Sequence, residues 1–329
     1  MIAWILFFIF SSIVAYGLAW FFLPLYRSIT VSTSVQLGAK YRTDKDETVS
    51  FTNVFEQTKP SVNLSVVVPA YNEEERMTIM LNETIRFLDH RRRRDPDRTF
   101  EVIIVNDGSK DKTESIAQSY TKANGDDVVR VLNLTKNSGK GAAVQAGMLH
   151  ARGAYILMVD ADGASRFSDL VELERAIIEV ENDGSGIAIG SRAHLKQDAI
   201  AKRHWFRNFL MFGFHILVST IAGVGIADTQ CGFKLFTRNT ARVLFANLHL
   251  PRWAFDVELI FMAGRLSVPM VEVPIHWTEI PGSKVSLLDG AITMLRDIIA
   301  IRICYMTGLW TIQPWREVYL LAKSKSRKE

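Results

Sequence analysis

Two carboxylates, Asp160 and Asp162, stand one residue apart in the stretch YILMVDADGASR, directly after the apolar run 155–159. The run has the length and composition of a buried parallel strand, so the pair is expected at its carboxyl end, where open α/β sheets bind ligands. Carboxylates this close repel each other unless a cation lies beside them. A divalent metal carrying a diphosphate is one candidate. A solvated turn in which Asp160 caps the next helix is the alternative, and the rest of the chain decides between them.

The elements that must position this pair alternate between apolar runs and helical periodicity. Apolar runs that predict strands begin at Leu64 and Phe100, continue at 128–134, 155–159 and 186–192, and end with 271–277. All but the last are followed by turn residues and a helical pattern. This rhythm predicts an α/β fold with a doubly wound, largely parallel sheet.

Other residues that could do chemistry also follow predicted strands. Asp107 ends the second run, and Lys140 stands between Gly139 and Gly141 before a helix that follows the third. Such a turn at a helix N-terminus could bind a phosphate, with a solvated loop lysine as the alternative. The turn lacks the P-loop spacing of two glycines, Lys and Ser or Thr, which argues against a P-loop nucleotide hydrolase.

Residues 1–26 contain no Asp, Glu, Lys or Arg, and are predicted to form a transmembrane anchor. A cleaved signal peptide is the competing interpretation, but it should have a charged start and a shorter apolar core. Arg27, Lys40 and Arg42 follow the span. The positive-inside rule therefore places the body of the protein in the cytosol.

Two later apolar segments suit a membrane surface. One is the helix predicted at 203–226, which begins with basic residues and is interrupted by His215 and glycines; the other is 288–310, followed by the basic tail KSKSRK. Both favour interfacial or buried helices over further spans. The predicted divisions are an anchor (1–26), a linker (27–61), an α/β domain that includes the apolar helix (62–285), and an amphipathic C-terminal region with a basic tail (286–329).

The composition limits the choice of partners and compartment. A net charge of +4 and a pI near 9.0 suit anionic ligands or an anionic membrane face. No basic stretch carries interleaved aromatic residues, so no nucleic-acid partner is expected. Cys231 and Cys304 are the only cysteines, which favours a reducing compartment.

Several motifs together resemble the family 2 inverting glycosyltransferases with the GT-A fold, over roughly residues 64–284. They are PAYNEE at Pro69, VNDGSKDKT at Val105, NSGKGAAV at Asn137, DADGAS at Asp160 and GSR at Gly190. DTQCGFKLF at Asp228 and FDVE at Phe255 are similar to the members that transfer glucose from UDP-glucose to dolichyl phosphate in the endoplasmic reticulum membrane. Mannose-transferring members, which use GDP-mannose, typically carry Gln and His where this chain has residues 163–165.

The resemblance implies a role for each matching residue. It places uracil and ribose over Pro69, Ala70, Tyr71, Glu73 and Asp107, with Asp160 near the ribose. It also assigns Mg²⁺ or Mn²⁺ to Asp160 and Asp162. Lys140 and Lys284 are further expected partners of the diphosphate. Asp162, Arg192 and Asp228 are the expected catalytic residues. Asp228 aligns with a base of relatives, and orienting Arg192, Lys234 or a sugar hydroxyl is its alternative role.

The acceptor implied by the resemblance is a polyisoprenyl phosphate at a lipid bilayer. A phosphate monoester is largely dianionic at pH 7, so it needs less deprotonation than a sugar hydroxyl. Arg192 and Arg207 are expected to hold it, because the guanidinium fork matches phosphate oxygens. Membrane snorkelling is the alternative for Arg207. His215, Asp256 and Glu258 are weaker candidates, with a satisfied core histidine as the alternative for His215.

Two other function classes compete with this interpretation. An inactive membrane scaffold with the same fold is disfavoured by the intact Asp160, Asp162 and Arg192. A nucleotidyltransferase shares the phosphate and metal requirements, but should lack the long apolar helix after the sheet.

Overall fold

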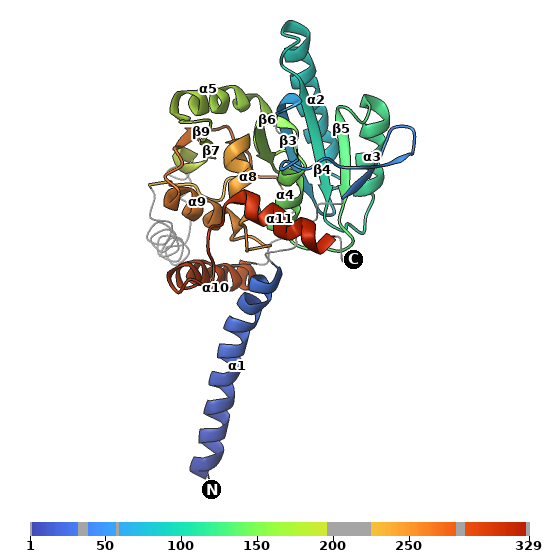
Figure 1. The fold of residues 1–329 in the computed structure, drawn as a ribbon. Helices are drawn as coiled ribbons and strands as arrows, with labels where there is room; N and C mark the ends of the chain where they lie inside the picture. The colour runs from blue at the N-terminus through green and yellow to red at the C-terminus, as the bar shows by residue number, and fades with distance from the viewer. Residues whose placement is uncertain (1, 32–38, 57–58, 196–224, 281–286, 327–329) are drawn as a thin grey trace.

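A computed structural model describes residues 2–31, 39–56, 59–195, 225–280 and 287–326. One long helix, α1 (Ile2–Val31), extends away from an α/β body, with the N-terminus at its far end (Figure 1). Residues 196–224 and 281–286 lie outside the described residues. The predictions for the helix 203–226, Arg207, His215 and Lys284 therefore stay predictions.

The body is built on a seven-stranded sheet of order β5-β4-β3-β6-β8-β7-β9. The strands are β3 (Val62–Ala70), β4 (Phe100–Asn106), β5 (Val129–Asn133), β6 (Gly153–Val159), β7 (Ile187–Ser191), β8 (Phe233–Thr237) and β9 (Met270–Pro274). Neighbouring strands from β5 to β6 are parallel, as are β7 and β9, whereas β8 runs antiparallel to both β6 and β7. The predicted α/β fold with a largely parallel sheet is confirmed.

Helices cover both faces of this sheet because its strands are apolar on both sides. Val66 and Val68 belong to one core cluster, which includes buried residues of the helices that cover that face, whereas Val67 belongs to the other. The first face carries α2 (Met77–Arg94), α3 (Thr113–Asn124) and α5 (Leu170–Val180), with the short helix η1 (Phe167–Asp169). The second carries α4 (Lys140–Leu149), α8 (Arg238–Ala246), α9 (Phe255–Arg265), α10 (Leu287–Met306) and α11 (Trp315–Ser326).

The strand β8 is not among the strands predicted from the sequence. Its sequence, FKLFT, carries Lys234 in the middle, and a lysine interrupts the apolar run that signals a buried strand. All five residues are nevertheless buried. The strand brings the chain back between β6 and β7, so it separates the two strand ends that carry Asp160 and Arg192.

Two segments are more ordered than a loop or a surface linker would be. The basic run Arg91–Arg94 forms the last turn of α2, where positive charge favours the helix dipole, and Arg91 pairs with Glu174. The predicted linker 27–61 contains an antiparallel pair, β1 (Lys40–Arg42) and β2 (Thr48–Ser50), followed by buried residues of the core. Within its described residues, this segment is therefore part of the folded body rather than a surface linker.

The helix α10 lies across the body near the C-terminal end of α1 (Figure 1). There the guanidinium carbon of Arg296 lies 5.0 Å from the ring centroid of Trp20. One face of α10 is buried, including Ile298 and Ile301, while Ile292 and other apolar side chains are exposed. The predicted amphipathic helix is therefore present, and its buried face packs on the protein core.

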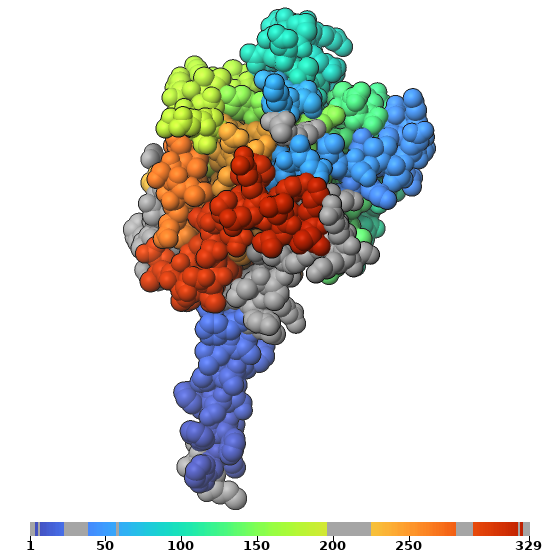
Figure 2. All heavy atoms as spheres, viewed as in Figure 1, coloured from blue at the N-terminus to red at the C-terminus, as the bar shows by residue number. Residues whose placement is uncertain are grey.

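A space-filling view shows α1 as a stalk below the body, and its described aromatic side chains are mostly exposed (Figure 2). Among the residues that the structure describes, no helix combines the length and the apolar character that crossing a membrane requires. The transmembrane helix predicted for residues 1–26 is therefore not confirmed.

Candidate active site

The carboxyl ends of β3, β4 and β6 meet in one cleft of about 460 Å³. It is lined by the residues predicted for the donor that the structure describes, together with the second carboxylate of the acidic pair: Pro69, Ala70, Tyr71, Glu73, Asp107, Lys140, Asp160 and Asp162. These strands are neighbours in the sheet, and parallel strands present their carboxyl ends at one edge. The fold therefore brings together residues that are distant in sequence.

Asp107 fixes the loop that enters α4. Its Oδ1 accepts a hydrogen bond from the backbone N–H of Ser138 at 2.7 Å, and its Oδ2 accepts one from Gly139 at 2.9 Å. Burial raises the pKa of Asp107, and these N–H groups act in the opposite direction. Asp107 therefore positions the start of the helix on which Lys140 stands.

The glycines beside Lys140 allow close packing against another segment of the protein. Gly139 has φ +101°, and a Cβ there would lie 2.4 Å from the carbonyl oxygen of Pro251. A Cβ at Gly141 would lie 2.6 Å from the carbonyl oxygen of Leu250. The sequence predicted a phosphate-binding turn, but the need for both glycines is explained by this backbone contact.

Lys140 is paired rather than solvated. Its Nζ lies 2.6 Å from Asp160 Oδ1, and its side chain is 17% exposed. Burial lowers the pKa of Lys140, but the nearby Asp160, Asp256 and Asp162 carboxylates outweigh it and hold the pKa above its usual value. The ammonium therefore stays charged beside the acidic pair, and the alternative of a solvated loop lysine is wrong.

The chain that packs against Asp160 has no room for a side chain at residue 232. The Asp160 N–H donates to the carbonyl oxygen of Gly232 at 3.1 Å, and a Cβ at Gly232 would lie 2.1 Å from Asp160 Oδ2. Gly232 is needed here because it lets the chain that enters β8 pass directly against the carboxylate.

The loop that carries the acidic pair is tied to the chain after β9. Asp162 Oδ1 accepts a hydrogen bond from the N–H of Ala164 at 2.9 Å. Ala164 in turn accepts one from the N–H of Thr278 at 2.9 Å, and Ser165 forms an antiparallel bridge with Trp277. These bonds hold the loop in place from outside its own strand.

A buried ion pair lies behind the cleft. Lys234 Nζ is 2.5 Å from Asp256 Oδ1 and donates to the carbonyl oxygen of Cys231 at 2.7 Å. Burial raises the pKa of Asp256, and Lys234 and Lys140 only partly offset this effect. Removing one partner of such a pair leaves a buried charge, at a cost of about 3–5 kcal/mol. Lys234 is thus the partner of Asp256, rather than of Asp228 as one prediction allowed.

Glu258 has a structural role in this region. Its carboxylate accepts hydrogen bonds from the backbone N–H groups of His249 and Leu250 and from the Tyr305 hydroxyl. It is fully buried and does not line the cleft. These contacts explain the residue without a part in chemistry.

Arg192 and Asp228 form a bidentate ion pair at the end of β7. Arg192 Nε lies 2.7 Å from Asp228 Oδ2, and Nη2 lies 2.9 Å from Oδ1. Burial lowers the pKa of Arg192, but Asp228 more than offsets this and holds the pKa above its usual value. Asp228 is buried, while the Arg192 side chain is 25% exposed. The geometry matches the predicted alternative in which Asp228 orients Arg192, because protonating Asp228 would break this pair.

Sequence reasoning missed several residues that line the cleft: Arg76, Asn137, Ala143, Ala161, Arg252, Trp253, Trp277, Glu279 and Ile280. Trp277 could have been found, because it stands at the carboxyl end of the predicted strand 271–277. Trp253 and Arg252 precede a helix and carry no comparable local signal.

The acidic pair fits a divalent metal held together with a diphosphate. Asp160 Oδ1 is buried and has no partner in hydrogen-bond geometry among the described residues, although the Lys140 ammonium is close. Within the described ranges, no group of three or more His, Cys, Asp or Glu side chains is placed to hold a metal. Two carboxylates are nevertheless enough for Mg²⁺, which takes its other ligands from phosphates and water.

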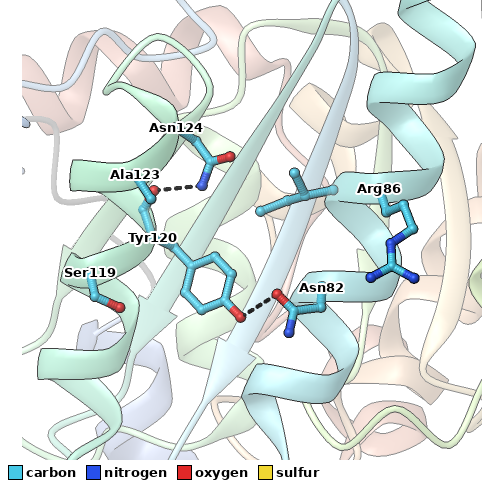
Figure 3. Close-up of a pocket in the computed structure, with 7 residues that line it drawn as sticks. Asn82, Arg86, Ser119, Tyr120, Ala123 and Asn124 are labelled. Atoms are coloured by element: carbon cyan, nitrogen blue, oxygen red, sulfur yellow. Dashed lines mark hydrogen bonds between the residues drawn. The ribbon is translucent and has the colours of Figure 1, made fainter.

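A second cavity, of about 370 Å³, lies between α2 and α3 and is lined by Asn82, Ile85, Arg86, Ser119, Tyr120, Ala123 and Asn124 (Figure 3). The Tyr120 hydroxyl donates to Asn82 Oδ1 at 2.7 Å. None of the residues predicted for chemistry lines this cavity, and none of its lining residues is acidic. The cleft at the carboxyl ends of the strands is therefore the candidate active site.

Comparisons with known proteins agree with the fold. The family model for glycosyl transferase family 2 matches residues 65–245, which is more than half of the chain. The chain therefore belongs to glycosyl transferase family 2. The resemblance inferred from the motifs is confirmed.

Three relatives that are similar over most of the chain share one name within this family. A dolichyl-phosphate beta-glucosyltransferase of Drosophila melanogaster is 52% identical over 81% of this chain and 82% of its own length. The protein of that name from Homo sapiens is 43% identical over 90% and 94%. The one from Saccharomyces cerevisiae is 41% identical over 77% and 78%.

Solved structures share the fold at low sequence identity. Mannosyl-3-phosphoglycerate synthase from Rubrobacter xylanophilus aligns with a TM-score of 0.54 at 16% identity, over 77% of each chain. Glucosyl-3-phosphoglycerate synthase from Mycobacterium tuberculosis, in complex with Mg²⁺ and UDP, aligns with a TM-score of 0.50 at 16% identity, over 75% of this chain and 80% of that one.

Replacing Gly232 tests whether the position of Asp160 matters. Gly232→Ala is expected to lower glycosyl transfer about 100-fold, because the new methyl group must displace the Asp160 carboxylate and small misplacements at a reacting centre are costly. Gly225→Ala is the matched control, since a Cβ there meets nothing within 4 Å. Transfer rates and thermal unfolding of both variants would be measured. A folded Gly232→Ala enzyme with normal transfer would show that Asp160 need not stay where it is.

Proposed function

We propose that this protein transfers glucose from UDP-glucose to dolichyl phosphate, with UDP as the second product. The relatives' activity motivates the choice of substrates. The observation that carries the proposal is the placement of Asp160 and Asp162 at the end of β6 and of the Arg192–Asp228 pair at the end of β7, within one sheet. This arrangement provides one place for the diphosphate of the donor and another for the phosphate of the acceptor.

The order of the strands in the sheet supports one direction for the bound UDP-glucose. Pro69, Ala70 and Asp107 follow β3 and β4, which suits the uridine end, and Lys140 beside the acidic pair suits the diphosphate. Mg²⁺ or Mn²⁺ held by Asp160 and Asp162 would neutralise the charge that develops on the leaving diphosphate. A structural neighbour that contains Mg²⁺ and UDP supports this assignment.

The acceptor phosphate removes the need for a strong base. One of its oxygens forms a bond to the anomeric carbon of glucose while the bond from that carbon to the UDP oxygen breaks. No proton has to leave the dianionic nucleophile. Arg192 holds the phosphate, and Asp228 orients the guanidinium. Attack opposite the leaving group inverts the α-linked donor and gives dolichyl β-D-glucosyl phosphate.

A lipid acceptor requires the enzyme to work at a bilayer. In this proposal α1 inserts its apolar side chains into the endoplasmic reticulum membrane, and α10 lies at the surface with Ile292 and Leu295 toward lipid. The uncharged run 1–26 and the exposed side chains of α1 support insertion. The basic residues that follow support a catalytic domain on the cytosolic side.

The reaction itself is tested with membranes that contain the full chain, dolichyl phosphate, and UDP-glucose, UDP-GlcNAc or GDP-mannose in parallel. We expect transfer from UDP-glucose alone, a β-linked product, and loss of transfer in excess EDTA. Asp162→Asn serves as the inactive control. An α-linked product, or transfer from GDP-mannose instead, would contradict the proposal, and full activity in EDTA would contradict the metal assignment.

Arg192 tests the place of the acceptor. Arg192→Lys keeps one positive charge but loses the bidentate geometry, so the KM for dolichyl phosphate should rise, or turnover fall, by one to two decades, equivalent to about 1.5–3 kcal/mol. UDP-glucose binding should stay near normal.

A second variant distinguishes loss of acceptor binding from unfolding caused by removing the arginine. Arg192→Ala combined with Asp228→Asn removes both charges, so no unpaired carboxylate is left buried, and it should fold and still lack acceptor binding. If these variants lost UDP-glucose binding and kept the normal KM for dolichyl phosphate, the acceptor would have been placed wrongly.

Truncation tests the membrane attachment. Deletion of residues 1–26 should reduce the fraction of protein that sediments with membranes without abolishing it, because α10 and the basic tail remain and stable attachment usually needs two signals. Sedimentation at low and high salt measures both contributions. Full-length protein that stays in the supernatant would exclude α1 as an anchor, and a truncated protein that is fully soluble at low salt would exclude the role of α10.

A further inference from the structure

The sheet leaves a defined place for the transferred sugar. If the proposed function is right, the diphosphate lies by Asp160 after β6 and the acceptor phosphate by Arg192 after β7. The anomeric carbon must then lie between these two groups, because it exchanges a bond with one for a bond with the other. The glucosyl ring is therefore expected over the chain next to the ends of β6 and β7.

Trp277 is held at this place by backbone bonds. It follows β9, the neighbour of β7, and it lines the cleft. Its bridge with Ser165 is flanked by a hydrogen bond from the Arg166 N–H to the His276 carbonyl oxygen at 3.0 Å, and by the bond from Thr278 to Ala164. The indole thus moves with the loop that carries Asp160 and Asp162.

The same indole also contacts the acceptor side. The guanidinium carbon of Arg192 lies 5.3 Å from the centroid of the Trp277 ring, within the range of a cation–π contact. Asp228 fixes that guanidinium from the other direction. Trp277 is therefore in contact with the machinery for both substrates.

We propose that Trp277 is the platform on which the transferred glucosyl ring lies, and that it helps to select glucose among hexoses. The ring hydroxyls of glucopyranose are equatorial, so its two faces present C–H groups that suit the apolar face of an indole. A sugar with an axial hydroxyl, such as the C4 epimer galactose, would direct a polar group at the ring. That hydroxyl would lose its hydrogen bonds with water and gain none in return.

The cleft contains a second tryptophan that serves as a matched control. Trp253 lies with its ring centroid 5.7 Å from Lys140 Nζ, on the diphosphate part of the site. Replacing it should weaken UDP and UDP-glucose binding to a similar extent. Replacing Trp277 should affect the sugar-bearing ligand alone.

Calorimetry with UDP and with UDP-glucose, in the presence of Mg²⁺, tests the proposal on the full chain. Trp277→Leu is expected to weaken UDP-glucose binding about tenfold and to leave UDP binding unchanged. Trp277→Phe should recover part of the loss, because it keeps an aromatic face. The ratio of kcat/KM for UDP-glucose to that for UDP-galactose should fall more in Trp277→Leu than in Trp277→Phe. Thermal unfolding confirms that the variants are folded.

Two results would overturn the platform. One is an equal change in UDP and UDP-glucose binding in Trp277→Leu. The other is a rise only in the KM for dolichyl phosphate, which would mean that Trp277 supports Arg192 and nothing more. If wild-type protein binds UDP-glucose but does not transfer glucose to dolichyl phosphate, the proposed function fails. The binding of UDP and UDP-glucose by the Trp277 and Trp253 variants still tests whether Trp277 contacts the sugar.

Discussion

The structure depends on how the charge of Asp160 is held at the edge of an apolar sheet. A carboxylate that is partly removed from water is costly unless a positive group stays beside it. Lys140 provides that group, and the buried pair of Lys234 and Asp256 lies behind both. Because Asp256 also interacts with Lys140, these four side chains form one set of alternating charges. A change at any one of them alters the electrostatic environment of the others.

The backbone keeps these charges in place by direct hydrogen bonds and by small residues. Asp107 fixes the loop before α4, and therefore Lys140. Gly232 lets the chain before β8 pass against Asp160, and the bridge at Ser165 ties the acidic loop to the segment after β9. Three strands of the sheet thus contribute to the position of one carboxylate. Such support is what a site needs when its geometry must be accurate to a fraction of an ångström.

The strands that end at the site could be predicted, because each contains at least three successive apolar residues shortly before the polar residues that follow it. The same rule failed for β8, where Lys234 breaks the run. That lysine is tolerated inside the sheet only because Asp256, twenty-two residues further along, pairs with it. No local pattern records a pairing between distant residues. The roles of Gly232 and of Gly139 were also hidden, because a glycine required by a close backbone contact looks like any other glycine until the neighbouring segment is placed.

The pairing of the carboxylates also bears on the kind of acceptor that the site can use. An acceptor hydroxyl would need a general base, and a carboxylate serves as one only if it can take a proton without losing a stronger partner. On this side of the sheet Asp228 is engaged with Arg192, and Asp256 with Lys234. Protonating either would leave a guanidinium or an ammonium without its counter-charge in a largely buried position, which opposes the transfer. A nucleophile that already carries its negative charge avoids this difficulty and benefits from the arginine. The geometry around Arg192 is therefore better suited to a phosphate acceptor than to an alcohol.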